Sequence, residues 1–259
     1  MRYITCIKQV PNTTDVRINP ETNTLVREGV ESVVNPFDMY AIELALSLRE
    51  KFGGEVIGIS MGPPQAEEAL REAISVGVDR AYLVTDKSFA GADTLATSRT
   101  LVTAIRYIGG ADVILVGKQA IDGDTAQVGP GIAESMNIGQ VTFVRDVTEI
   151  GDGTLRVLRI TDKGRSEVEA ELPVLLSVTK LDREPRLPSL RGKLRAKKEK
   201  IEHLDAKVLN LPEGSVGLAG SPTQVIRIFT PQRHTQGEIK RGKPDELGSW
   251  LVEKLRGVL

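Results

Sequence analysis

Residues 112–117 read DVILVG, a nearly continuous apolar run. Such a run is typical of a strand that is covered on both faces, as in a parallel sheet. Three similar runs precede it, at residues 3–8 (YITCIK), 55–61 (EVIGISM) and 81–85 (AYLVT). The sequence therefore predicts four parallel strands.

Amphipathic segments separate these strands. Residues 39–52, 65–76 and 95–108 carry apolar residues at helical spacing, and each segment is followed by glycine. Glycine suits the left-handed residue that ends many helices. The alternation predicts an α/β fold with a doubly wound, mostly parallel sheet. If the strand order is 3-2-1-4, the loops after the first and fourth strands face each other across a ligand crevice.

Two regions depart from the alternation. Residues 16–18 and 24–26 flank a turn-forming stretch and predict a small hairpin after the first strand. Beyond about residue 140, apolar segments alternate with Gly-Asp-Gly and Asp-Lys-Gly turns, which predicts an added antiparallel ribbon made of residues 141–147, 155–160, 167–171 and 174–179. We expect residues 1–181 to form the α/β domain. Residues 201–259 contain too few apolar residues for a core of their own, so we expect residues 182–259 to form a docking loop and an arm that packs on another protein.

The composition excludes several classes of protein. The 259 residues include 34 basic and 35 acidic ones, so the net charge of −1 argues against nucleic acid or an anionic membrane as partner. No apolar run approaches the roughly 18 residues of a membrane span. One cysteine and two histidines argue against a disulfide, a zinc site or an iron–sulfur cluster. Without a signal-like N-terminus, we expect a cytoplasmic protein whose redox chemistry, if any, belongs to an organic cofactor.

Two loops are candidates for binding a ligand. The loop at residues 117–130 (GKQAIDGDTAQVGP) leads into a predicted helix from about residue 127 to 136. Backbone N–H groups at that helix start, with Thr125 and Gln127, suit phosphate oxygens, although a plain surface connection is the alternative. Before residues 39–52, Asn35 is a candidate N-cap, Pro36 suits the first helical position and Asp38 suits a capping box. This turn either adds amides to the crevice or caps the helix and does nothing more.

The common cofactor and catalytic patterns are missing. No G-x-G-x-x-G motif follows the first strand, and the two histidines form no triad with a marked serine or aspartate. Cys6 falls in the middle of a predicted strand, where a small buried hydrophobic role is more typical than a nucleophilic one.

Six further segments stand out along the chain: residues 6–11 (CIKQVP), 34–43 (VNPFDMYAIE), 60–64 (SMGPP), 116–130 (VGKQAIDGDTAQVGP), 191–201 and 219–225. Together, and over essentially the whole chain, they resemble the β subunit of electron transfer flavoproteins. The resemblance implies an adenine-nucleotide-binding, Rossmann-like fold and an α subunit that carries its own FAD. One branch of the family holds AMP in the β subunit, and an electron-bifurcating branch holds a second FAD. Residues 125–130 (TAQVGP) and 90–98 (AGADTLATS) resemble the bifurcating branch.

The resemblance also implies roles for particular residues. The implied function is to take a hydride from NADH onto this FAD and to divide the electrons between the α-subunit FAD and ferredoxin or flavodoxin, an activity expected only in complex with the α subunit. The implied docking residues for a dehydrogenase or quinone reductase are Leu190, Arg191 and Lys193, with a solvated basic face as the alternative. The implied nucleotide contacts are Cys6, Asn35, Pro36, Phe37, Asp38, Met61, Thr94, Thr97, Gly117, Lys118, Gln119, Ala120, Ile121, Asp122, Gly123, Asp124, Thr125, Ala126, Gln127 and Val128.

Two other functions stay open. A non-bifurcating electron transfer flavoprotein would use the same fold to hold AMP as a structural group. A stand-alone nucleotide-binding regulator of the same superfamily would need no partner and no flavin.

Overall fold

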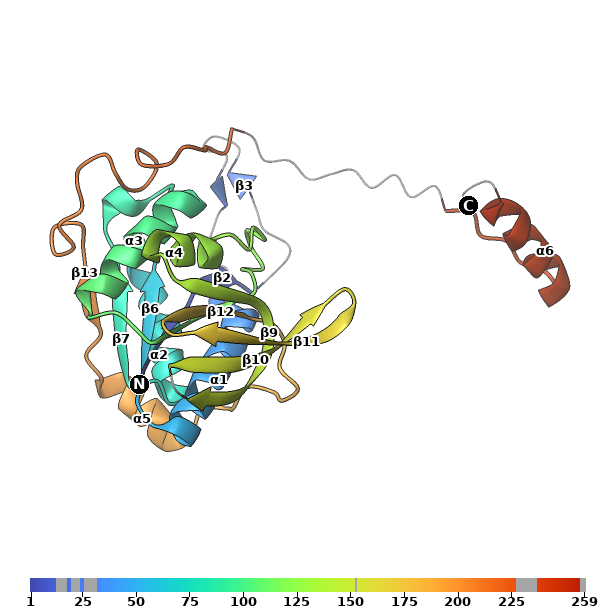
Figure 1. Cartoon of the computed structure of the whole chain (residues 1–259). Helices are drawn as coiled ribbons and strands as arrows, with labels where there is room; N and C mark the ends of the chain where they lie inside the picture. Colours follow the sequence, from blue (N-terminus) through green and yellow to red (C-terminus); the bar gives the residue numbers. More distant parts are fainter. Residues whose placement is uncertain (13–17, 20–23, 26–31, 152, 227–236, 257–259) are drawn as a thin grey trace. The chain divides into compact units, whose positions relative to one another are not determined.

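The computed structural model describes residues 1–12, 18–19, 24–25, 32–151, 153–226 and 237–256 (Figure 1). The chain divides into two compact units, Met1–Ile226 and Arg227–Leu259. None of the described helices combines the length and the apolar character needed to cross a membrane.

A large sheet forms the centre of the first unit. Among the described residues it has nine strands, in the order β11-β10-β9-β12-β8-β1-β6-β7-β13. The predicted order is confirmed, because β7, β6, β1 and β8 are adjacent in that sequence and parallel. The strands are β1 (Arg2–Cys6), β6 (Glu55–Met61), β7 (Arg80–Val84), β8 (Val113–Gly117), β9 (Gly139–Gly151), β10 (Thr154–Thr161), β11 (Gly164–Glu171), β12 (Val174–Val178) and β13 (Glu202–Leu204).

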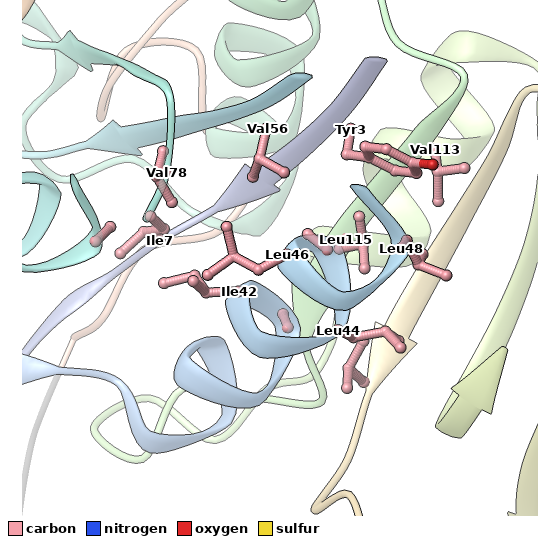
Figure 2. Packing of buried hydrophobic residues seen from close by; sticks show 14 of the residues in the cluster. Tyr3, Ile7, Ile42, Leu44, Leu46, Leu48, Val56, Val78, Val113 and Leu115 are labelled. Carbon is pink, nitrogen blue, oxygen red and sulfur yellow. The ribbon is translucent and has the colours of Figure 1, made fainter. Parts of the chain in front are cut away.

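Helices cover both faces of the sheet, as the doubly wound prediction requires. On one face, α1 (Pro36–Phe52), α2 (Glu67–Val76) and α5 (Leu190–Lys198) contribute to one buried cluster. Figure 2 shows part of it, in which Ile42 and Leu46 of α1 lie close to Val56 and Leu115 of the strands. On the other face, α3 (Thr94–Tyr107) and α4 (Val128–Met136) pack with the intervening side chains of the same strands. The α/β fold predicted from the sequence is confirmed.

A two-stranded sheet brings α1 to the end of β1. Here β2 (Gln9–Pro11) pairs antiparallel with β5 (Ser32–Val34), and Gln9 lies opposite Val34. The predicted hairpin is confirmed where it is described, because β3 (Ile18–Asn19) pairs antiparallel with β4 (Thr24–Leu25). The rest of that prediction, residues 16–17 and 26, lies outside the described residues. Strand β5 thus brings the chain back to the end of β1 before α1 begins.

The prediction for residues 141–179 is only partly right. Strands β9, β10 and β11 form the expected antiparallel ribbon. Strand β12 does not belong to it, because it lies between β8 and β9 and runs parallel to both. All five residues of β12 are buried, so the strand is covered on both faces like the central strands.

The segment after residue 181 is more buried than its composition suggested. Residues up to Ile226 belong to the first unit. Strand β13 pairs with the edge of β7, and Leu204, Leu209 and Val216 are buried against the α3 and α4 side. Residues 201–226 therefore pack in part on the first unit of their own chain, and packing of the arm on another protein stays a prediction. In the second unit, α6 (Pro244–Leu255) has no buried residue among those described.

Candidate functional site

The candidate site lies where the order of the central strands reverses. From β1 the chain proceeds to β6 and β7 on one side, and then crosses to β8 on the other side of β1. The helices that follow these two strands, α1 and α4, lie on opposite faces of the sheet. The carboxyl ends of such a strand pair are the usual ligand position in an open α/β sheet. Lys8 and Gly117 mark the two strand exits.

Asp38, in the first turn of α1, joins these two exits. Its Oδ2 accepts a hydrogen bond from the Lys8 backbone N–H (2.7 Å), and its Oδ1 accepts one from the Gly117 N–H (3.2 Å). The side chain is almost fully buried. Burial raises the pKa of Asp38 to about 7, although the hydrogen bonds from Asn35, Lys8 and Gly117 act in the opposite direction.

Asn35 occupies the N-cap position of α1, but its side chain does not cap the helix. The predicted N-cap position is confirmed, but the side-chain capping bond does not form. Its Nδ2 donates to Asp38 Oδ1 (2.9 Å) and to the Gln119 carbonyl (2.9 Å), and its Oδ1 accepts from the Ile121 N–H (3.2 Å). The side chain is thus used to hold the loop after β8, which competes with capping for the same atoms.

The loop after β8 is tied together through its charged residues. Lys8 Nζ contacts Asp122 Oδ1 (2.6 Å), and Gln119 donates to the Asp124 carboxylate. The Lys118 ammonium lies 5.7 Å from the centroid of the Phe37 ring and 5.5 Å from that of Phe143. These distances are within the range of cation–π attraction. Both carboxylates of the loop therefore have a partner, and its cation rests between two rings.

The end of this loop meets the start of α3. Thr94 Oγ1 donates to Gln127 Oε1 (3.1 Å), and Ser98 Oγ donates to the Val128 carbonyl (3.2 Å). Asp93 caps α3, because its Oδ1 accepts from the N–H groups of Leu95 and Ala96 (both 3.0 Å). The starts of α3 and α4 are therefore neighbours.

The start of α4 has its backbone donors uncapped. No side chain of the described residues caps it at Gln127, which has helical dihedrals (φ −99°, ψ −22°) and follows Ala126 at φ +55°. A left-handed residue followed by a right-handed one orients successive N–H groups toward one point, which favours an anion. Gly129 allows the close packing of this turn, because a Cβ there would lie 2.7 Å from a Val116 methyl group.

Cys6 is held as a neutral thiol at the end of β1. Burial, and then the nearby Asp38 carboxylate, raise the pKa of Cys6 to about 12. Its partly buried side chain packs against the α3 and α4 face of the core. The prediction of a small apolar role agrees with these surroundings, because a thiol with a raised pKa is a poor nucleophile.

The structure brings together most of the predicted nucleotide contacts. Direct contacts join Asn35, Asp38, Gly117, Gln119 and Ile121 into one cluster. Met61 lies at the end of β6, opposite Val84 of β7, and Thr97 lies in the first turns of α3. The other predicted residues are Pro36 and Phe37 at the start of α1, and Lys118, Ala120, Asp122, Gly123, Asp124, Thr125, Ala126 and Val128 along the loop into α4.

Phe143 of β9 was not predicted, yet it contributes to the crevice. Its backbone has φ +58°, which is unusual for a residue with a side chain, and 41% of its surface is exposed. The sequence VTFVRD shows an ordinary strand pattern and contains no signal for this conformation. The conformation arises where the register between β9 and β12 shifts, between the partners of Leu176 and Val178.

The predicted docking residues lie elsewhere, on α5. Leu190, Arg191 and Lys193 are exposed in its first turn, and Leu187 and Leu194 add to the apolar surface (88% and 54% exposed). The helix rests on α2, because a Cβ on Gly192 would lie only 2.0 Å from the Ser75 carbonyl oxygen. Arg195 donates to the carbonyl of Asp79, just before β7, so α5 lies toward the amino ends of the strands.

The chain is similar to one family of known proteins. The electron transfer flavoprotein domain matches residues 22–209. The electron transfer flavoprotein subunit beta of Thermoanaerobacterium thermosaccharolyticum is 49% identical over 256 residues, which is 98% of each chain. Protein FixA of Bradyrhizobium diazoefficiens is 45% identical, over 89% of this chain and 83% of its own. The caffeyl-CoA reductase-Etf complex subunit CarD of Acetobacterium woodii is 44% identical, over 99% of this chain and 98% of its own. With a family match over residues 22–209 and relatives of 44–49% identity, the chain belongs to the electron transfer flavoprotein family, among its beta subunits.

Proposed function

We propose that this chain pairs with an electron transfer flavoprotein α subunit, binds FAD in the crevice between β1 and β8, and receives a hydride from NADH there. In this proposal it divides the electrons between the α-subunit FAD and a low-potential acceptor such as ferredoxin or flavodoxin. Family membership supports the electron-transfer role and the α partner. The similarity to a subunit of a caffeyl-CoA reductase-Etf complex supports a dehydrogenase as a further partner.

The observation that carries the proposal is the uncapped start of α4. Val128 and Gly129 are its first two residues, and Pro130 has no N–H to offer. The two N–H groups, the adjoining left-handed turn at Ala126 and the helix dipole together suit a pyrophosphate. The Thr94 and Gln127 side chains, which meet at this point, add polar atoms for the same group.

The charges around the crevice are compatible with an anionic ligand. Asp122 is paired with Lys8, and Asp124 accepts from Gln119, so each carboxylate is already engaged within the protein. The Lys118 ammonium contacts the rings of Phe37 and Phe143 at the end of β8. A phosphate bound here would lie near a positive charge that the two rings hold in place.

Bound FAD would supply the hydride and single-electron chemistry, and the chain's own residues bind and orient it. The amides of residues 125–129 hold the phosphates, since the Asp124 N–H already donates to the Ala120 carbonyl. Cys6, Asn35, Pro36, Phe37 and Asp38 shape the wall of the site beside β1. Met61, Thr94 and Thr97 border it from β6 and α3. Cys6 keeps its proton at neutral pH, so it adds no charge to this wall.

We assign the docking of the dehydrogenase or quinone reductase to α5. Leu187, Leu190 and Leu194 are exposed, and Arg191 and Lys193 lie between them. Apolar anchors surrounded by charges are typical of interfaces in which the charges guide the encounter. Helix α6, with Leu251 and Val252 each about half exposed, is assigned to contact with the α subunit.

The test is the nucleotide content of the purified αβ complex, measured by acid release and chromatography. Two FAD per complex, with NADH-dependent bleaching of both, is the expected result. One FAD and one AMP would place a structural nucleotide in this chain and overturn the hydride role. A β chain that is folded, monomeric and unaffected by the α subunit would instead support the stand-alone regulator.

Docking is tested separately with Leu190→Ala and the matched variant Leu251→Ala in α6. Leu190→Ala should lower the rate of electron transfer to the partner enzyme at least tenfold, since apolar anchors dominate such interfaces. It should leave nucleotide content unchanged, whereas Leu251→Ala should weaken association with the α subunit and leave the transfer rate per intact αβ complex unchanged. An unchanged transfer rate for Leu190→Ala would contradict the assignment.

A further inference from the structure

The carboxylate of Asp38 is surrounded by donors that all belong to the protein. Lys8 N–H donates to Oδ2 (2.7 Å), and Gly117 N–H (3.2 Å) and Asn35 Nδ2 (2.9 Å) donate to Oδ1. Three N–H groups donate to the two carboxyl oxygens, so both oxygens must act as acceptors. The ionised carboxylate only accepts hydrogen bonds, whereas the protonated form carries an O–H donor. The charged form is therefore the one that fits this geometry.

Asn35 extends the same arrangement into the loop after β8. It bonds the carbonyl of Gln119 and the N–H of Ile121, while Asp38 bonds the N–H of Gly117. The turn that begins α1 thus holds the loop at three backbone positions. The other end of the turn is fixed to β1, since the Asn35 N–H donates to the Lys8 carbonyl (2.9 Å).

No space is left for a ligand atom between Asp38 and the strand end. A Cβ added to Gly117 would lie 2.2 Å from Asp38 Oδ1 and 2.8 Å from the Asp38 nitrogen. Only glycine at position 117 allows this approach. Asp38 itself has 6% of its surface exposed. A nucleotide in the crevice therefore meets the backbone that Asp38 holds and does not meet its carboxylate.

We infer that Asp38 is a positioning residue, whose ionised carboxylate holds the ends of β1 and β8 in the arrangement that binds the nucleotide. The inference rests on the proposed function only in that the crevice binds an adenine nucleotide, whether FAD or AMP. It changes the role expected for Asp38 from the family resemblance, which was direct contact.

The ionisation of Asp38 makes this role testable by pH. Burial raises its pKa to about 7. Protonation turns one oxygen into a donor, which opposes the N–H groups of Lys8 or Gly117. The groups that face it from β1 are the Cys6 thiol, whose pKa is raised to about 12, and Lys8, whose ammonium is paired with Asp122 of the loop. Lys118 contacts Phe37 and Phe143. Nucleotide affinity should therefore rise as the pH increases from 6 to 8.

The experiment uses the αβ complex in three forms: wild type, Asp38→Asn and Glu43→Gln. Glu43 is a matched control, because it is a carboxylate of the same helix with the same exposure of 6%, and it contacts Arg186 rather than the crevice. The dissociation constants of FAD and of AMP are measured between pH 6 and 8. Hydrogen exchange of the Lys8 and Gly117 amides is followed in the nucleotide-free complex.

We expect Asp38→Asn to lower the affinity for the nucleotide by about tenfold at pH 8. This factor corresponds to the loss of a hydrogen bond to a charged acceptor. The affinity of this variant should no longer depend on pH between 6 and 8, and both amides should exchange faster. Glu43→Gln should keep the wild-type profile. If Asp38→Asn weakened nucleotide binding but left amide exchange unchanged, Asp38 would contact the nucleotide directly and the inference would be overturned. A wild-type pH profile of affinity in Asp38→Asn would overturn it as well.

The wild-type complex keeps the inference testable even if Asp38→Asn fails to fold. Protection of the Lys8 and Gly117 amides, corrected for intrinsic exchange, should decrease as the pH falls from 8 to 6. Constant protection would contradict the inference. Binding of AMP in place of FAD would overturn the hydride proposal and leave the role of Asp38 intact, so the two failures are distinguishable.

Discussion

The buried carboxylate of Glu43 is bound by Arg186, which lies 143 residues further along the chain. Its Oε2 accepts from the Arg186 backbone N–H (3.0 Å) and Nε (2.8 Å), and its Oε1 accepts from Nη2 (3.1 Å). Burial alone would raise the pKa of Glu43, but the hydrogen bonds from Arg186 outweigh it and hold the pKa below its ordinary value. This contact fixes the segment before α5 to the middle of α1.

Replacing Arg186 should therefore be costly. Arg186→Met leaves the buried Glu43 carboxylate with only Ser47 (3.2 Å) and the more distant Arg183 (3.8 Å) among the described residues, and we expect a loss of about 3 kcal/mol in the free energy of unfolding. Urea denaturation of the complex measures it. Arg191→Met, which removes an exposed arginine of α5, should cost less than about 0.5 kcal/mol. Equal losses for the two variants would show that the contact adds no stability.

Asp38 and Glu43 should affect the pH dependence of stability in opposite directions. Because the folded-state pKa of Asp38 is raised to about 7, its contribution is present at low pH and is lost as the pH rises from about 4 through 7. The pKa of Glu43 is lowered, so its contribution is present above about pH 4.5 and is lost as the pH falls.

Asp38→Asn should therefore remove a decline of up to about 1.4 kcal/mol per pH unit between pH 5 and 7, and Glu43→Gln should flatten the profile below pH 4.5. Urea midpoints at a series of pH values provide the measurement. Parallel profiles for wild type and Asp38→Asn above pH 5 would contradict the raised pKa. Stability and nucleotide affinity should thus change in opposite directions with pH, because ionisation of Asp38 opposes folding and assists binding.

Gly192→Ala tests the contact between α5 and α2. In an exposed helix this substitution usually stabilises by about 1 kcal/mol. Here the added Cβ would lie 2.0 Å from the Ser75 carbonyl oxygen, so we expect destabilisation and faster hydrogen exchange in α5. Gly248→Ala in α6 is the control, because nothing lies within 4 Å of its added Cβ. If both substitutions stabilise, α5 does not rest on α2.

Phe143 and Lys118 should be energetically coupled. The ammonium lies 5.5 Å from the ring centroid, and such pairs contribute about 0.5–1 kcal/mol at exposed sites. A double-mutant cycle of Phe143→Leu and Lys118→Met, read by chemical denaturation, should give a coupling of that size. Phe143→Gly should relieve about 1 kcal/mol of backbone strain while losing the ring contact. A coupling near zero would leave Phe143 without a role in holding Lys118.

The central fold was predictable because its signals are local. Each buried strand is a short apolar run, and glycines at positions 53, 77 and 109 have the positive φ that follows a helix. Strand β12 shows the limit. Its sequence, VLLSV, indicates burial on both faces, but its neighbours β8 and β9 lie far back in the chain. The turns before it suggested an antiparallel ribbon, and no local sequence feature indicates that β12 lies between β8 and β9.

The candidate site was predictable as a set of loops, but its internal contacts were not. Asn35 satisfies every sequence rule for an N-cap, yet the carbonyl of Gln119 and the N–H of Ile121 use its side chain instead. Helix α5 was obscured because prolines at positions 185 and 188 precede it and Gly192 interrupts it, although Ser189 caps it by accepting from the Gly192 N–H (2.9 Å). Such outcomes depend on residues distant in sequence.

The pairing of β2 with β5 determines where the chain tolerates insertions. Gln9 and Val34 lie opposite each other, so the two ends of the intervening stretch are held side by side. Lengthening the stretch between them costs little free energy, since closing a loop becomes only slowly harder as it grows. Insertions there need not displace Asn35 or Asp38. This makes the stretch a suitable position for grafting a fluorescent reporter that leaves the crevice intact.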